Sequence, residues 1–222
     1  MDDDMFEHKW KALKRLAAMV GLAVTTALAL GLTPASAFAA PVILVMGDSL
    51  SAEYGLARGT GWVSLLEDRL KAQKFDYSVV NASISGETTS GGKTRLPALL
   101  QQHKPALVII ELGANDALRG LSLLSTQTNL RAMLAASRNA GARSLVIGMR
   151  IPPNYGQQYT ERFFQAFGSA AKEYKAGYVP FFLEHVVTRP EWFQQDRIHP
   201  TAAAQPAMLD TVWPHLQPML KR

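Results

Sequence analysis

The chain has 222 residues, 48% of them hydrophobic, which is enough for one well-buried domain and rather short for two. It contains no cysteine, so disulfides, thiolate catalysis and cysteine metal ligands are excluded. The formal net charge is +5, and its lysines and arginines form no cluster of the kind that binds nucleic acid, so we expect no nucleic-acid partner.

Residues 1–39 have the layout of a secretory signal peptide. A basic segment precedes an apolar stretch from Leu16 to Leu32, and two overlapping A-x-A sites predict cleavage after Ala37 or Ala39. The alternative is an uncleaved membrane anchor, because about 17 apolar residues are just enough to span a bilayer. We expect cleavage, which leaves residues 40–222 as a monomeric periplasmic or secreted domain without a stable membrane anchor.

Five short apolar runs rich in valine and isoleucine follow. They are nearly continuous rather than alternating, which is typical of strands buried on both faces. The predicted strands are Val42 to Met46, Tyr77 to Asn81, Ala106 to Leu112, Ser144 to Met149 and Tyr178 to Phe182.

Segments with apolar residues at helical spacing lie between these runs. One begins near Trp62. A second contains Leu130 to Leu134, and we expect Gly141 to close it. A third begins near Phe163, with Gly177 as its expected end.

A last helix begins near Ala203. It contains Pro206 in its first turn, where proline is tolerated, and Pro214 later, where we expect a kink or break. Strands that alternate with helices predict an α/β fold, a doubly wound parallel sheet with helices on both faces in a single domain.

Ser49 follows the first predicted strand directly, in the turn "GDSLS". Ligands of open α/β sheets bind beyond the carboxyl ends of the strands, and a serine there becomes a nucleophile when a histidine base and an orienting acid are near. Asp196 and His199 form such a pair in "DRIHP", after the fifth strand. Taken alone, this pair also fits a surface ion pair or a metal site, although no third ligand stands at suitable spacing.

Acyl transfer also needs hydrogen-bond donors for the oxyanion. Gly86 follows the second strand, where the lack of a side chain lets a backbone N–H approach a ligand closely. Asn115 follows the third strand and offers a side-chain amide, and the backbone N–H of Ser49 is a third donor. The alternative is that Gly86 and Asn115 are ordinary turn residues.

Four blocks in this order and spacing resemble those of the SGNH, or GDSL, hydrolase family. The blocks are "GDSLS", the glycine of "ASISGETTSGG", "GAND" and "DRIHP". The resemblance spans essentially all of residues 40–222 and is strongest to bacterial thioesterase I, lysophospholipase and arylesterase enzymes, which have stretches similar to "MRIPPNYG" and "HPTAAAQP".

The resemblance implies a role for each residue. Ser49 is the nucleophile, His199 the base and Asp196 its orienting acid, while Ser49, Gly86 and Asn115 are the oxyanion donors. It further implies a flavodoxin-like sheet in the order 2-1-3-4-5, hydrolysis without metal or cofactor, and small-molecule or lipid acyl esters and thioesters as substrates. Asp48 is expected to fix the loop by hydrogen bonding and is not the acid of the triad.

Several other functions were compared with this one. "GETTSGGKT" does not match a phosphate-binding loop, because Glu87 stands where that pattern requires glycine. The G-x-S-x-G motif of α/β-hydrolases does not match either, because Ser51 replaces its last glycine. A binding protein that lost its chemistry is disfavoured by the complete set of groups. The main alternative is a carbohydrate esterase that deacetylates polysaccharides, disfavoured because the loops are rich in leucine and alanine.

The acyl group is expected to bind in an apolar channel beside Ser49. The residues predicted to line it follow the third and fourth strands, and core packing is the alternative role for them. They are Leu118, Leu121 and the segment Ile151 to Tyr155, in particular Ile151, Pro153 and Tyr155.

Overall fold

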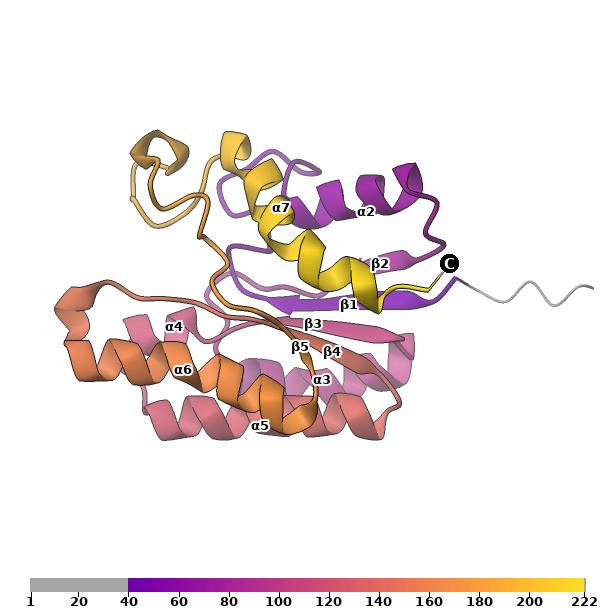
Figure 1. Ribbon diagram of the computed structural model, residues 1–222, viewed down its shortest axis with the longest axis horizontal. Helices are drawn as coiled ribbons and strands as arrows, with labels where there is room; N and C mark the ends of the chain where they lie inside the picture. The colour runs from indigo at the N-terminus through magenta and orange to yellow at the C-terminus, as the bar shows by residue number, and fades with distance from the viewer. Residues whose placement is uncertain (1–39, 222) are drawn as a thin grey trace, which may run out of the picture. The chain divides into compact units, whose positions relative to one another are not determined.

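Five parallel strands form a single sheet in the order β2-β1-β3-β4-β5, and helices cover both of its faces (Figure 1). The structure, a computed structural model, describes residues 40–221. The predicted signal peptide at residues 1–39 lies outside the described residues. The predicted single α/β sheet and its strand order are confirmed.

The strands and helices alternate along the chain, as the sequence pattern predicts. α2 and α7 cover one face of the sheet, and α3, α5 and α6 cover the other (Figure 1). None of the helices within residues 40–221 is long and apolar enough to cross a bilayer. The strands are β1 (Val42–Gly47), β2 (Ser78–Asn81), β3 (Leu107–Glu111), β4 (Arg143–Ile147) and β5 (Gly177–Val179). The helices are α2 (Trp62–Ala72), α3 (Thr89–His103), α4 (Ala114–Leu118), α5 (Leu123–Asn139), α6 (Gln157–Tyr174) and α7 (Gln205–Leu216).

The fifth strand is shorter than the sequence predicts. β5 ends at Val179 because Pro180 has no N–H to donate to the neighbouring strand. Gly177 is the first residue of β5 and does not close the preceding helix, so that prediction is wrong. α6 ends at Tyr174, and Lys175 adopts the left-handed conformation (φ +55°) that a glycine was expected to supply.

Two helices also differ from the prediction. α7 continues through Pro214 to Leu216, so the expected break is wrong; the proline removes one helical N–H donor, but only two residues of the helix follow it. The sequence pattern did not mark α3, because Gly91 and Gly92 in its first turn are poor helix formers. The side chain of Thr88 caps this helix by accepting a hydrogen bond from the N–H of Gly91.

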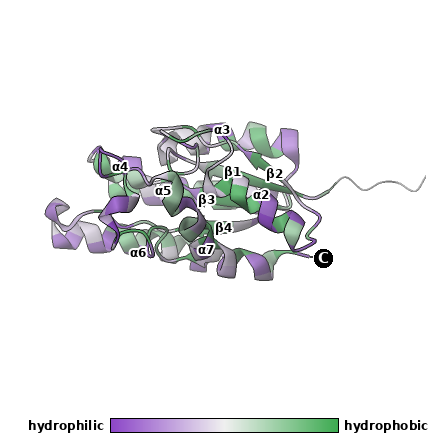
Figure 2. Cartoon of the chain, turned by 90° about the horizontal axis from the view of Figure 1, so that it is seen from above, coloured by the Kyte–Doolittle hydropathy of each residue, from purple (hydrophilic) through white to green (hydrophobic). Residues whose placement is uncertain are grey.

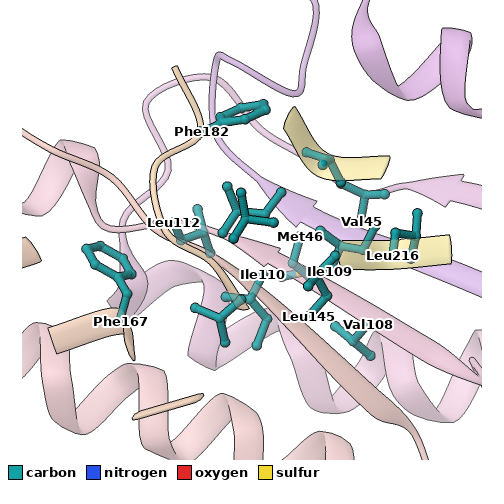
Figure 3. Close-up of a cluster of buried hydrophobic side chains, with 14 of the residues drawn as sticks. Val45, Met46, Val108, Ile109, Ile110, Leu112, Leu145, Phe167, Phe182 and Leu216 are labelled. Atoms are coloured by element: carbon teal, nitrogen blue, oxygen red, sulfur yellow. The ribbon is translucent and has the colours of Figure 1, made fainter. Parts of the chain in front are cut away.

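The core lies on both faces of the central strands. Every residue of β3 is buried, and so are the last five of β1, which explains their nearly continuous apolar sequence. Figure 3 shows Leu216 of α7 beside Val45 and Ile109, and Phe167 of α6 on the side of Leu112, all within one buried cluster. Figure 2 shows the same pattern as hydropathy, with apolar strands inside and helices that alternate between apolar and polar residues.

A buried carboxyl group lies under the turn that follows β1. Glu111 Oε2 accepts a hydrogen bond from Ser51 Oγ at 2.8 Å and from the backbone N–H of Asp48 at 3.3 Å. Trp62 Nε1 donates to Ser51 Oγ at 3.1 Å, which ties α2 to the same network. Gly47 is required here, since a Cβ atom would lie 2.6 Å from Ser51 and 2.8 Å from Glu111. The network therefore fixes the conformation of this turn.

Replacing this carboxyl group should change how stability depends on pH. Burial, together with the nearby charge of Asp48, raises the pKa of Glu111 well above its ordinary value of 4.5. The folded protein then keeps a proton that the unfolded chain loses, so Glu111 makes stability fall as pH rises from 4.5 through the raised pKa. The glutamine side chain of Glu111→Gln is neutral at every pH, so the variant does not lose stability in this way.

We expect the unfolding free energy of Glu111→Gln, relative to the wild type, to improve as pH rises above the ordinary carboxyl pKa of 4.5. Urea denaturation of both proteins at several pH values measures this difference. Two stability profiles that run parallel over the whole range would contradict the raised pKa of Glu111.

Candidate active site

The loops at the carboxyl edge of the sheet bring the predicted polar residues together. Ser49, Asn115 and His199 line a common cavity of about 500 Å³. Asp196 is hydrogen-bonded to His199, and Gly86 directly precedes Glu87, whose carbonyl oxygen accepts a hydrogen bond from Asn115. Four of the five predicted residues are therefore joined by the cavity or by direct hydrogen bonds, and Gly86 is adjacent in sequence to the residue that Asn115 contacts.

Ser49, His199 and Asp196 form a continuous hydrogen-bonded chain. His199 Nε2 lies 2.9 Å from Ser49 Oγ, and His199 Nδ1 lies 2.7 Å from Asp196 Oδ2. Asp196 Oδ1 accepts the backbone N–H groups of His199 and Ile198 at 3.0 and 2.9 Å. These backbone bonds, and the bond to the imidazole, lower the pKa of Asp196 to about 2. The carboxylate is therefore ionised near neutral pH and holds a proton on Nδ1 of the ring.

Two residues that the sequence analysis did not single out support the histidine. The ring of Tyr54 packs against the imidazole of His199, with ring centroids 4.3 Å apart. Gln194 donates from Nε2 to the carbonyl oxygens of Tyr54 and Pro200, and its backbone N–H donates to the carbonyl oxygen of His199 at 2.7 Å. Their sequence positions carry no motif, since contact with His199 depends on how the loops after β1 and β5 meet.

Two backbone donors beside Ser49 are free. The N–H groups of Ser49 and Gly86 have no hydrogen-bond acceptor among residues 40–221. Gly86 adopts a positive φ of +78°, a conformation that favours glycine, and this sets the direction of its peptide groups. Its carbonyl oxygen accepts a hydrogen bond from Arg119 Nη2 at 2.7 Å.

The side-chain amide of Asn115 is already engaged. Its Nδ2 atom donates to Asp48 Oδ2 at 3.0 Å and to the carbonyl oxygen of Glu87 at 3.1 Å. A ligand oxygen that binds this amide must therefore replace or share one of the two acceptors. The sequence motif did not indicate this competition.

The short helix α4 holds the loop that carries Gly86. Asn115 and Arg119, one helical turn apart, bond the consecutive carbonyl oxygens of Glu87 and Gly86. Between them, the buried carboxylate of Asp116 accepts the backbone N–H of Thr89 at 2.9 Å. The "GAND" block thus fixes the position of the loop after β2.

Asp48 shapes the turn around the serine, as the sequence analysis expected. Its Oδ1 atom accepts the N–H of Leu50 at 3.0 Å. Burial raises the pKa of Asp48 to about 6, while the bond from Leu50, the charge of His199 and the bond from Asn115 act in the opposite direction. Asp48 makes no bond to the imidazole, which is held by Asp196.

The predicted acyl-binding residues divide into two groups. Leu118 and Ile151 line the cavity beside Ser49. Leu121, Pro153 and Tyr155 do not line it: Leu121 follows the end of α4, and the other two lie in a 3₁₀ turn, Pro153–Tyr155, that exposes them.

Five of the eleven apolar residues that line the cavity come from the segment after β5. The sequence pattern did not mark these side chains as cavity residues. Phe181 falls within the predicted fifth strand, and the run "FFLEHVV", which contains Phe181, Leu183 and Val187, has no clear period. No group of three or more histidine, aspartate or glutamate side chains within residues 40–221 is arranged to hold a metal ion. The wall residues from this segment are Phe181, Leu183, Val187, Phe193 and Ile198.

Comparison with known proteins identifies relatives along most of the chain. The model of the GDSL-like lipase/acylhydrolase family matches residues 45–206. Esterase TesA of Pseudomonas aeruginosa is 52% identical over 182 residues, which cover 82% of this chain and 90% of that protein. Thioesterase 1/protease 1/lysophospholipase L1 of Escherichia coli K12 is 44% identical over 184 residues, covering 83% and 87% of the two chains.

A solved structure agrees with these sequence matches. The crystal structure of TesA has a TM-score of 0.79 to this fold at 51% identity, and the match covers 81% of this chain and 99% of that one. With a family match over most of its length, the chain belongs to the GDSL-like lipase/acylhydrolase family, the SGNH hydrolases, and is a carboxylic ester hydrolase.

Proposed function

We propose that the chain is an exported serine hydrolase that cleaves acyl esters and thioesters through an acyl-enzyme on Ser49. The observation that carries this proposal is the hydrogen-bonded chain from Ser49 through His199 to Asp196 at an apolar cavity. A serine needs a base in contact with its hydroxyl, and the base needs an acid that fixes its tautomer. Both contacts are present before substrate arrives.

The reaction proceeds in two acyl-transfer steps. His199 Nε2 takes the proton of Ser49 Oγ as the oxygen attacks the acyl carbonyl carbon, and ionised Asp196 stabilises the imidazolium that forms. His199 then gives that proton to the leaving alcohol or thiol, and the carbon–oxygen or carbon–sulfur bond breaks. Water, deprotonated by His199, attacks the acyl-enzyme and releases the carboxylic acid and the free serine.

The oxyanion binds the donors around Ser49. The free N–H groups of Ser49 and Gly86 are available to it directly. The Asn115 amide joins them by exchanging its bond to the Glu87 carbonyl oxygen or to Asp48 for one to the oxyanion. The bond from Arg119 to the Gly86 carbonyl oxygen keeps this peptide in place while the exchange occurs.

Substitutions should distinguish the effect of losing the nucleophile from the effect of losing an oxyanion donor. Ser49→Ala removes the attacking oxygen and should lower kcat by at least about 10⁴-fold. Asn115→Ala removes one oxyanion donor and should lower kcat by about 10²–10³-fold, with a much smaller change in KM. Steady-state kinetics on p-nitrophenyl butyrate measure both effects, and the exposed Ser125→Ala in α5 serves as the matched control. Wild-type turnover by Ser49→Ala would refute the assignment.

The apolar cavity favours substrates with an aliphatic acyl group over acetylated polysaccharide. Its wall of leucine, isoleucine, valine and phenylalanine offers few polar partners for a sugar. Rates on p-nitrophenyl esters from acetyl to palmitoyl, an acyl-CoA, a lysophospholipid and acetylated xylan test this choice. We expect acyl esters and thioesters to be cleaved faster than xylan acetate, and a preference for xylan acetate would establish the carbohydrate-esterase alternative.

Export is proposed from the sequence of residues 1–39. Expression in a Gram-negative bacterium followed by N-terminal sequencing of the fractionated protein tests it. The chain recovered outside the cytoplasm should begin at Phe38 or Ala40, after the A-x-A sites. An intact N-terminus in a membrane fraction would show an anchor instead.

A further inference from the structure

The exposed apolar residues of this protein are confined to one edge of the sheet. Eight large apolar side chains within residues 40–221 are exposed, and every one follows the carboxyl end of a strand. They come from all five connecting segments and lie on the side of the molecule where the strands end, at the left of Figure 1. We call this set the mouth rim; its members are Tyr54, Ile84, Leu118, Leu121, Leu124, Tyr155, Val187 and Ile198.

Four of the eight members of the mouth rim lie at the cavity or against its histidine. Leu118, Val187 and Ile198 line the cavity itself, and Tyr54 packs on His199. Leu124 is the most exposed member, at 70%, in the first turn of α5. Scattered single apolar residues need no explanation, but a group gathered around one opening indicates an interaction surface.

The segments that carry the mouth rim contain arginine but no lysine. They are residues 48–61, 82–88, 112–124, 148–156 and 180–204, and they contain five exposed arginines. Two of them lie over aromatic rings: Arg150 over Phe164 at 3.5 Å and Arg189 over Trp192 at 4.3 Å. The five are Arg58, Arg119, Arg150, Arg189 and Arg197.

Fewer carboxylates than arginines are exposed in the same segments. Asp48 and Asp116 are buried, Glu53 is partly buried, and Glu87 is partly buried and paired with Arg95. Glu184, Glu191 and Asp196 are exposed beside the five arginines, so the exposed charge around the mouth rim is positive on balance.

We propose that the mouth rim docks this enzyme on an anionic lipid surface, with the cavity opening toward the lipid. Exposed apolar side chains insert at the headgroup boundary, and nearby arginines are attracted by anionic lipids. A protein bound over the mouth rim would close the cavity to substrate, whereas a lipid surface delivers acyl esters into the cavity. That last point rests on the proposed function; the docking itself does not.

Site-specific fluorescence tests the docking directly, because the chain lacks cysteine and takes a single label at any chosen position. We use a Ser49→Ala background with an environment-sensitive fluorophore on Leu124→Cys or Tyr155→Cys. Lys71→Cys and Lys172→Cys, exposed in the last turns of α2 and α6 at the other edge, are the controls. We expect phosphatidylglycerol vesicles to shift the emission of the two rim labels to the blue and to leave the control labels unchanged.

Two results would overturn the proposal. One is an absence of any shift at the rim labels, which would leave the surface to a protein partner. The other is an equal shift at rim and control positions, which would show that the molecule contacts lipid without a defined orientation. Since each label reports only its own surroundings, contact made by residues 1–39 cannot imitate the expected result.

The charge of the surface is tested with matched arginines. Arg189→Gln removes a cation stacked on Trp192 at the rim, and Arg138→Gln removes one stacked on Tyr174 at the other edge. We expect Arg189→Gln to weaken binding to phosphatidylglycerol vesicles about fivefold and Arg138→Gln to change it little. Equal binding of the wild type to phosphatidylcholine vesicles would overturn the choice of an anionic surface.

Hydrolysis of a soluble ester separates this proposal from the proposed function. Leu124→Asp should lower vesicle binding and leave the rate on p-nitrophenyl butyrate unchanged, because Leu124 does not line the cavity. If the wild type cleaves the soluble ester and the rim labels on the Ser49→Ala variants do not respond to vesicles, only the docking fails. If the rim labels respond and the wild type cleaves no ester, only the proposed function fails.

Discussion

The parallel register of β1 with its two neighbours is the constraint on which the rest of the structure depends. Ile43 pairs with Val79 on one side and with Leu107 on the other, so all three strands run toward the same edge of the sheet. β1 and β3 end side by side at Gly47 and Glu111, and β2 ends opposite Val45. Each crossover helix returns the chain to the same edge of the sheet. For this reason Ser49 and His199, separated by 150 positions, meet at 2.9 Å. A sheet with an antiparallel central pair would place these residues on opposite edges.

The site is held from below and from the side by groups that take no part in the proposed chemistry. Glu111, buried under the first turn, and Asp116, buried in α4, each bind backbone or hydroxyl donors of neighbouring segments. Such buried carboxyl groups are costly to desolvate, and the hydrogen bonds that they accept offset part of that cost while fixing the positions of the donor segments. The position of Gly86 is fixed in this way, because Asn115 and Arg119 bond the carbonyl oxygens of residues 87 and 86.

The sequence predicts what is local and periodic, and misses what depends on contacts between loops. The runs of β1 and β3 are unambiguous because both of their faces are buried, whereas β5 is cut short by Pro180 and α3 is obscured by its two glycines. The order of the sequence motifs is enough to predict that Ser49, Asp196 and His199 belong to one site. No such rule finds Tyr54 against the imidazole, the engaged amide of Asn115, or the apolar wall that follows β5. These depend on how separate loops pack together.

We propose that the contact with His199 makes Ser49 the nucleophile of this ester hydrolase. The most direct measurement is peptide mass spectrometry after reaction with an alkylphosphonate fluoride, which labels an activated serine. We predict one phosphonate group, on the peptide that contains Ser49, and labelling at least about 10²-fold slower in His199→Ala. A label on another residue, or an unchanged rate in His199→Ala, would contradict the claim.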